Sequence, residues 1–279
     1  MLWLVIGILA YFFLALASFY DKLFLKEKED PKAYVFYVGL LGGLVIFLAP
    51  FFEFSLISIW PILEGIVYII ALYFLYYVLN RSEASTIIPA QGAIQVIFIL
   101  LLSVVFFEIK EVNLLALGIL ILGSFLISFS KRLKRKEILF CVFSAFLFAI
   151  DFVLVKQVFL MHSFLEGLFL MRMTSFFVVL FFLLDKSFRK NIFKTKKQEK
   201  KFFFLAQIAG GLGILLQSYA IRLVSPSNLA VLNAIKGIQY VFLFLLAVLF
   251  LKEDFSRRNL FFKIVSIVLI VVGIILFAI

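Results

Sequence analysis

Three charged side chains lie deep inside long apolar segments of this chain: Asp151, Arg172 and Lys236. A lone charge at the centre of a bilayer costs ~3 kcal/mol or more, so such groups are expected to face a cavity or one another. Two cations and one anion favour an organic anion, or a zwitterion whose carboxylate meets Lys236 or Arg172 and whose ammonium meets Asp151. Asp151 is also the candidate for carrying a coupling proton.

The polar neighbours of these charges predict one wall of a cavity. At ~1.5 Å per residue, the three charges lie at similar depths of ~8–14 Å from the same side of the membrane. Helical spacing then adds Asn233 and Tyr240 to the face of Lys236, pairs Gln91 with Gln95, and places Gln207, Gly211 and Ser218 on one stripe. The predicted substrate-binding residues are Lys236, Arg172, Asp151, Gln91, Gln95, Asn233, Tyr240 and Gln207.

Purely structural roles are the alternative for most of these residues. Asp151 and Arg172, on consecutive spans, can form an ion pair that fixes helix packing. The glutamines can hydrogen-bond between helices, and the G-G-L-G at 210–213 suits close packing. Lys236 has no acidic residue one turn away to neutralise it. Glu64 and Glu166 lie near predicted span ends, where we expect them at the interface.

Composition places the chain in a membrane. Hydrophobic residues make up 65% and charged residues 15% of its 279 positions, whereas a soluble domain is nearer half apolar and a quarter charged. The net charge of +11 comes mostly from short loops between apolar runs, which disfavours a nucleic-acid partner. The single Cys141 and single His162 predict no disulfide, no metal site and no cofactor.

The apolar runs predict an all-α integral membrane protein with ten transmembrane helices, because they show no alternation typical of barrel strands. The predicted spans are residues 2–20, 33–51, 62–79, 84–107, 114–129, 138–155, 164–184, 202–221, 228–251 and 260–279. Pro31, Pro61 and Pro226 fall at span starts, whereas Pro89 lies inside a span and is expected to kink it or free a carbonyl.

Basic residues predict the orientation. The loops after the odd-numbered spans carry 21 Lys and Arg, against three on the other side. By the positive-inside rule, both termini lie outside a cell (inner or plasma) membrane. The basic runs at residues 131–136 and 185–201 are expected to contact anionic lipid headgroups.

The two halves of the sequence match at a fixed offset of 145 residues. Ser82 aligns with Ser227, Gln91-Gly92 with Lys236-Gly237, and Glu108 with Glu253. Such a match indicates an internal duplication, residues 1–130 and 131–279. Five spans per half make the two repeats inverted, a pattern typical of transporters with the site where the repeats face each other.

The segments N-R-S-E-A-S-T-I-I-P (80–89) and F-F-E (106–108), with Gly118 and Gly123, resemble the EamA repeat of the drug/metabolite transporter superfamily. S-P-S-N-L-A (225–230), F-L-K-E (250–253) and Gly273 resemble it more loosely, and Lys22 and Lys156 look like the basic residues that end two of its helices. The resemblance covers the whole chain and implies transport of a metabolite. Lys236 departs from the family's usual uncharged residue, and the predicted external termini depart from its usual topology.

The favoured function is a monomeric secondary transporter for a small polar metabolite that works by alternating access. A lipid or lipid-linked-sugar flippase of the same fold is the alternative, which a lateral opening toward lipid would favour. A membrane-embedded enzyme is disfavoured, since the sequence contains no catalytic His constellation and no Gly-rich phosphate loop.

Overall fold

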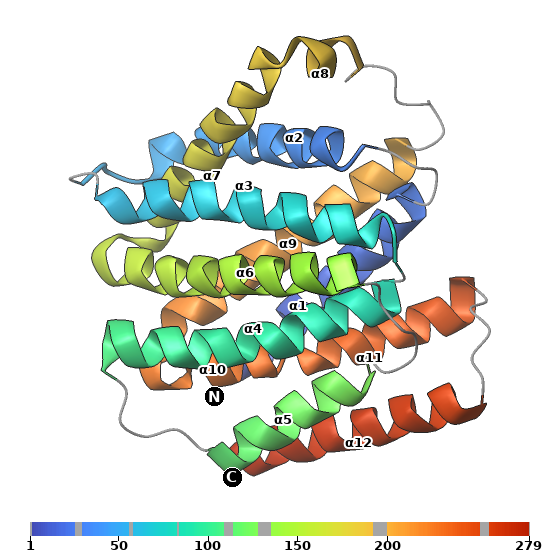
Figure 1. The fold of residues 1–279 in the computed structure, drawn as a ribbon. Helices are drawn as coiled ribbons and strands as arrows, with labels where there is room; N and C mark the ends of the chain where they lie inside the picture. Colours follow the sequence, from blue (N-terminus) through green and yellow to red (C-terminus); the bar gives the residue numbers. More distant parts are fainter. Residues whose placement is uncertain are drawn as a thin grey trace.

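The computed structural model describes residues 2–25, 30–55, 58–82, 84–108, 114–127, 135–191, 200–251 and 257–278. Every regular element in these ranges is helical, as the apolar runs predict (Figure 1). A helix makes all its backbone hydrogen bonds within its own segment, which is what a chain in lipid requires.

The main helices are α1 (Leu2–Leu25), α2 (Pro31–Gly42), α3 (Ile59–Leu79), α4 (Ala84–Phe107), α5 (Leu114–Ile127), α6 (Arg135–Met161), α7 (Phe164–Leu180), α9 (Lys200–Leu223), α11 (Gly237–Leu246) and α12 (Arg257–Ala278). The shorter elements are η1 (Gly43–Phe51), η2 (Phe181–Leu184), α8 (Lys186–Asn191), η3 (Pro226–Asn228), α10 (Leu229–Ala234) and η4 (Ala247–Leu251).

Within the described residues, eight helical segments are long and apolar enough to cross a membrane. They correspond to eight of the predicted spans. The other two predicted spans correspond to α5 and to α12, which contains the shorter apolar stretch Ile264–Ile274.

Proline positions explain several helix boundaries. As predicted, α2 begins at Pro31, where the Asp30 side chain caps the helix by accepting from the Lys32 backbone N–H at 3.0 Å. Pro89 lies inside α4 without ending it. The second predicted span is not one α-helix: it continues beyond Gly42 as the 3-10 segment η1, which contains Pro50. Pro50 lies near the end of η1, where its missing backbone N–H removes one helical hydrogen bond.

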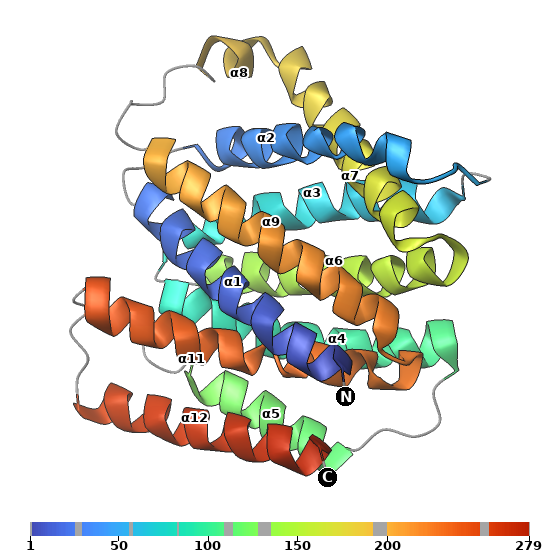
Figure 2. The ribbon, with the colours of Figure 1, turned by 180° about the vertical axis from the view of Figure 1, so that it is seen from behind.

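The helices associate in pairs that join the two halves of the sequence. α1 packs along α9, α3 along α6, and α5 along α12. α4 packs against both α6 and α10 (Figures 1 and 2). The start of α1 and the end of α12 lie on the same side of the molecule (Figure 1).

Reciprocal glycine contacts join α5 and α12. A Cβ atom on Gly123 would lie 2.9 Å from the Ile270 side chain, and one on Gly273 would lie 2.7 Å from the Leu120 side chain. The two helices therefore approach each other more closely than residues larger than glycine would allow.

Two buried or half-buried lysines cap helix ends in corresponding ways. Lys22 of α1 donates to the carbonyls of Leu79 (3.0 Å) and Ser82 (2.7 Å) at the end of α3. Lys156 of α6 donates to the carbonyls of Ile221, Arg222 and Val224 at the end of α9. Each cation satisfies carbonyls that lack a helical partner and lies at the negative end of a helix dipole.

Candidate functional site

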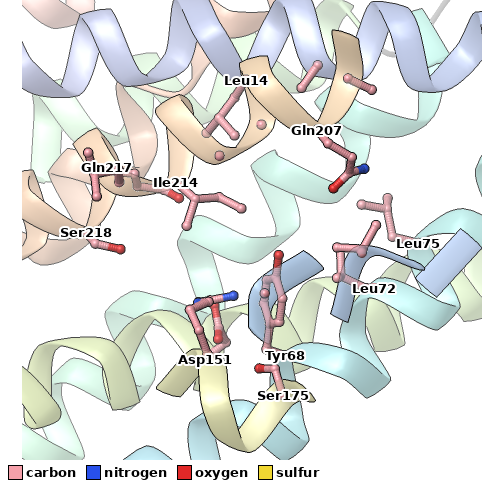
Figure 3. Close-up of a pocket in the computed structure, with 18 of the residues that line it drawn as sticks. Leu14, Tyr68, Leu72, Leu75, Asp151, Ser175, Gln207, Ile214, Gln217 and Ser218 are labelled. Carbon is pink, nitrogen blue, oxygen red and sulfur yellow. The ribbon is translucent and has the colours of Figure 1, made fainter. Parts of the chain in front are cut away.

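A cavity of about 680 Å³ lies among α1, α2, α3, α6, α7 and α9, with residues of α4 and α11 also in its lining. In Figure 3, Asp151 and Tyr68 lie across this cavity from Ile214 and Gln207 of α9. The volume suits a small metabolite, and its walls come from both halves of the sequence.

The structure brings six of the eight predicted site residues to this cavity. They are Lys236, Arg172, Asp151, Gln91, Gln95 and Gln207. Asn233 and Tyr240 are buried, at 1% and 2% exposure, but are not among its described lining residues.

Arg172 forms its salt bridge with Glu64, and none within 4 Å joins it to Asp151. Its Nη2 donates to Glu64 Oε1 at 2.9 Å, and its guanidinium lies 4.2 Å from the centre of the Tyr68 ring. Glu64 is 0% exposed, so its assignment to the interface is wrong. α3 begins at Ile59 and places Glu64 inside the helix bundle. With Glu64 included, the formal charge of Asp151, Glu64, Arg172 and Lys236 is zero, not the excess positive charge that the sequence suggested.

Asp151 lies within this charged group. It interacts electrostatically with Glu64, Arg172 and Lys236, and it is 9% exposed. Its Oδ1 atom has no hydrogen-bond partner among the described residues, and the same holds for Arg172 Nε. Buried polar atoms are normally satisfied, so these two lining residues retain the capacity to bind a ligand.

Lys236 lies where the ninth predicted span is broken. α10 ends at Ala234 and α11 begins at Gly237. Its Nζ donates to Gln95 Oε1 at 3.3 Å, and among the described residues it forms no salt bridge within 4 Å. This cation therefore faces the cavity with a neutral partner from α4.

The break has a definite hydrogen-bond pattern. The backbone N–H of Lys236 donates to Asn233 O, three residues back, and Gln239 N–H likewise donates to Lys236 O. Because an α-helix would direct the Lys236 N–H to Leu232 O, the Leu232 carbonyl needs another donor. Tyr11 of α1 supplies it, with its hydroxyl 2.7 Å from Leu232 O.

The same break explains why Asn233 and Tyr240 do not lie with Lys236. The expected shared face requires one continuous helix, and the tighter turn changes the direction of side chains on either side of it. The Tyr240 hydroxyl instead occupies the position that a Cβ atom would take on Gly92 of α4. Both amide atoms of Asn233 are buried without a partner among the described residues.

The three glutamines line the cavity, and two of them also join helices. Gln95 of α4 donates to Phe148 O of α6 at 3.1 Å, and Gln207 of α9 donates to the Tyr34 hydroxyl of α2 at 3.3 Å. Gln91 donates to Gln95 Oε1 at 3.3 Å, one turn away on the same helix. The role of interhelical hydrogen bonding therefore applies to Gln95 and Gln207.

The glycine cluster of α9 also serves two purposes. Gly213 packs closely against Leu14 of α1, where a Cβ would lie 2.8 Å from Leu14 Cγ. Gly211 has no atom within 4 Å of such a Cβ and lines the cavity. Close helix packing therefore requires a glycine at position 213, whereas Gly211 lies beside open space.

A separate polar cluster lies at the α6–α7 turn. Glu166 Oε1 accepts from the Ser55 backbone at 2.7 Å and lies 3.4 Å from His162 Nδ1, while His162 Nε2 lies 2.9 Å from Ser58 Oγ. Glu166 lies in the first turn of α7, near a span end as expected, and is 3% exposed. These contacts attach the segment after η1 to the turn between α6 and α7.

The basic runs expected to contact lipid lie largely outside the described residues. Positions 131–134 and 192–199 fall there, as does Glu253. The prediction of anionic headgroup binding therefore stays a prediction.

Apolar helices that enclose buried charged groups and a cavity are typical of membrane transporters. A family model described as the EamA-like transporter family matches residues 135–279, more than half of the chain. The chain belongs to this family. It is therefore a multi-pass membrane transporter and not an enzyme.

The fold is also similar to that of a solved protein. A crystal structure aligns with a TM-score of 0.65 and 16% identity, over 97% of this chain and 94% of the other. At this identity the match supports the fold alone. No curated protein matches the sequence.

Proposed function

We propose that the protein is a secondary transporter for a small polar metabolite, in the first place an amino-acid-like zwitterion and in the second an organic anion. The main support for this proposal is the position of Lys236. It lies at a helix break, lines the cavity and forms no salt bridge among the described residues. A discontinuous helix at the cavity is a common way to expose polar groups to a substrate. The neutral total of the four buried charges favours the zwitterion, with its carboxylate at Lys236 and its ammonium at Asp151.

Two inverted halves, residues 1–130 and 131–279, would give alternating access by rocking around this cavity. The corresponding lysine caps and the reciprocal glycine contacts of α5 and α12 support this arrangement. So does the family match, which begins at residue 135. In this proposal the protein crosses the cell membrane ten times as a monomer, with both termini outside.

The experiment is ligand-induced thermal stabilisation of the purified protein, with wild type and Lys236→Ala measured side by side. The panel contains amino acids, phosphorylated metabolites, nucleosides, quaternary amines and lipid headgroups. A ligand at 100 times its Kd adds ~2.7 kcal/mol to the free energy of unfolding. We expect an amino acid or a carboxylate to stabilise wild type and to lose that effect in Lys236→Ala. Equal shifts in both proteins would remove Lys236 from the site.

Proton coupling through Asp151 is tested by transport. In proteoliposomes, a pH gradient should drive uptake by wild type, and Asp151→Asn should abolish the effect of the gradient. Retained pH-driven uptake in that variant would assign coupling elsewhere.

One observation favours the flippase as a second candidate. Leu44 of η1 and Phe204 and Ile208 of α9 line the cavity and are also 58%, 56% and 62% exposed. Leu44 and Ile208 lie well inside their spans, so the cavity reaches the surface at a depth that faces lipid.

Gly211→Leu tests this lateral route, because the added side chain enters open space beside the cavity. If lipid is the substrate, wild type moves a fluorescent phospholipid between leaflets of a vesicle and Gly211→Leu slows that movement. Phospholipid movement no faster than in protein-free vesicles would exclude the flippase.

A further inference from the structure

A second carboxylate lines the same cavity near the end of α1. Asp21 is 8% exposed and belongs to the cavity lining. The hydroxyl of Tyr34 donates to Asp21 Oδ1, and the hydroxyl of Tyr76 donates to Oδ2 at 3.3 Å. The carboxylate is thus held by donors from α2 and α3, which fix its position at the cavity wall.

No described basic side chain neutralises Asp21. The nearest in sequence, Lys22, directs its Nζ to the carbonyls of Leu79 and Ser82. The salt bridges of the described residues join other groups. A buried ion without a partner is costly, and two neutral hydroxyl donors leave its charge uncompensated.

A second hydrogen-bond acceptor, the amide oxygen of Gln239, lies near Asp21 on the other side of Ser18. Ser18, one turn earlier on α1, accepts from Gln239 Nε2 at 3.2 Å and donates to Leu14 O at 2.8 Å. Gln239 is 3% exposed and lines the cavity, and its Oε1 has no hydrogen-bond partner among the described residues. A carboxylate and a free amide oxygen together need a ligand that donates hydrogen bonds and carries positive charge.

This group lies apart from Lys236. α1 lies beside α10 and α11 at a constant register: Tyr11 contacts Leu232 and Ser18 contacts Gln239, and each pair is 221 positions apart. By the same register, Lys236 is level with position 15 of α1. Asp21 lies six residues further along, about 9 Å at the helical rise. The two charged groups of an α-amino acid share one carbon, so a molecule whose charges are further apart spans these two levels more readily.

We propose that Asp21, with Ser18 and Gln239, forms a separate subsite for the ammonium group of a transported molecule. The inference rests on the proposed transport function and adds a substrate class to it. A primary amine, or a zwitterion with well-separated charges, fits the cavity better than a simple anion does. Tyr76, whose hydroxyl donates to Asp21, also lines the cavity.

The test is titration calorimetry in lipid nanodiscs with two probes of equal length, butylamine and butanoate. We expect Asp21→Asn to raise the Kd of butylamine at least tenfold and to leave that of butanoate within twofold. Asp30→Asn is the matched control, because it removes the same charge from an exposed helix cap outside the cavity lining. We expect it to leave both Kd values unchanged. Unchanged butylamine binding in Asp21→Asn overturns the subsite.

Lys236→Gln separates this inference from the proposed function. It should weaken butanoate at least tenfold and leave butylamine within twofold. If butanoate is unaffected by Lys236→Gln, the proposed site fails, whatever Asp21 does. If butylamine instead depends on Asp151, the proposed site stands and the Asp21 subsite fails.

A measurement on wild type covers the case in which Asp21→Asn does not fold. Dicyclohexylcarbodiimide modifies carboxyl groups in apolar cavities, and peptide mass spectrometry resolves Asp21 from Asp151 and Glu64. Saturating butyltrimethylammonium chloride, a cation that cannot attack the activated carboxyl, should slow modification of Asp21 at least fivefold, and sodium chloride should not. Equal rates with and without the organic cation would also overturn the subsite.

Discussion

The helix α4 and the pair α10–α11 contain the two sequence segments that match at an offset of 145 residues, but they differ at one turn. α4 runs unbroken through Pro89, Gln91 and Gly92. The second segment breaks between Ala234 and Gly237 and places Lys236 in the gap. Similar sequence patterns therefore give different backbones at the turn that presents a charge to the cavity.

The largest expected effect is on ligand affinity at this turn. Loss of a charge-assisted hydrogen bond of ~1.5–3 kcal/mol should raise the Kd of butanoate roughly 10- to 150-fold in Lys236→Gln. Gln91→Ala, at the matching position of α4, should raise it only about 2- to 10-fold. Calorimetry compares the two, and equal effects would mean that the halves contribute alike.

The contact between the two helices should be sensitive at Gly92. Gly92→Ala places a methyl group where the Tyr240 hydroxyl lies, and should lower the free energy of unfolding by ~1–3 kcal/mol. Gly118→Ala is the control, because its Cβ meets no atom within 4 Å. There the helix propensity of alanine should leave stability equal or up to ~1 kcal/mol higher. A similar loss in both would contradict the close approach, as measured by chemical unfolding in mixed micelles.

The hydrogen bond that satisfies the break should contribute less. Tyr11→Phe leaves Leu232 O without its donor, and should cost about 1–2 kcal/mol of stability. It should also weaken butanoate, since the turn that positions Lys236 loses its support. Tyr219→Phe, at a 37% exposed residue, should change neither. An unaltered melting temperature in Tyr11→Phe would show that the break is stable without this bond.

The smallest effect concerns Asn233, just before the break. Its amide has no partner among the residues that the structure describes, so Asn233→Leu should raise the free energy of unfolding by about 1 kcal/mol without changing butanoate affinity. A tenfold loss of affinity would instead return Asn233 to the binding site. Thermal unfolding and calorimetry on the same preparation distinguish these results.

Sequence reasoning found the charges that lie in the middle of spans and missed two that lie near their ends. Asp21 was overlooked because the first span was expected to end at Tyr20, whereas α1 continues to Leu25. Glu64 was assigned to the interface because the third span was expected to begin at Ile62, whereas α3 begins at Ile59. Hydropathy locates the apolar core of a helix, but a few residues of error at its end decide whether a carboxylate is buried.

The break in the ninth span could not be predicted from the sequence pattern either. The run around Lys236 is apolar apart from Asn233, Lys236 and Gln239, and Gly237 is the local sign of a helix interruption. The partner that stabilises the break, Tyr11, lies 221 residues away and becomes visible only when α1 packs beside α10 and α11. Pro89, by contrast, was expected to kink its span or free a carbonyl, and α4 continues through it without ending.

The glycine contacts of α5 and α12 have a consequence for ancestry. Each helix carries both parts of the contact one turn apart, Leu120 with Gly123 and Ile270 with Gly273. A single copy of either helix is therefore complementary to a second copy of itself. If the two halves arose by the proposed duplication, this interface needed no compensating substitution. Because α5 and α12 run in opposite directions (Figure 1), two separate copies of such a half could meet this way only if the membrane received them in both orientations. One chain that contains both helices has the two orientations in every molecule.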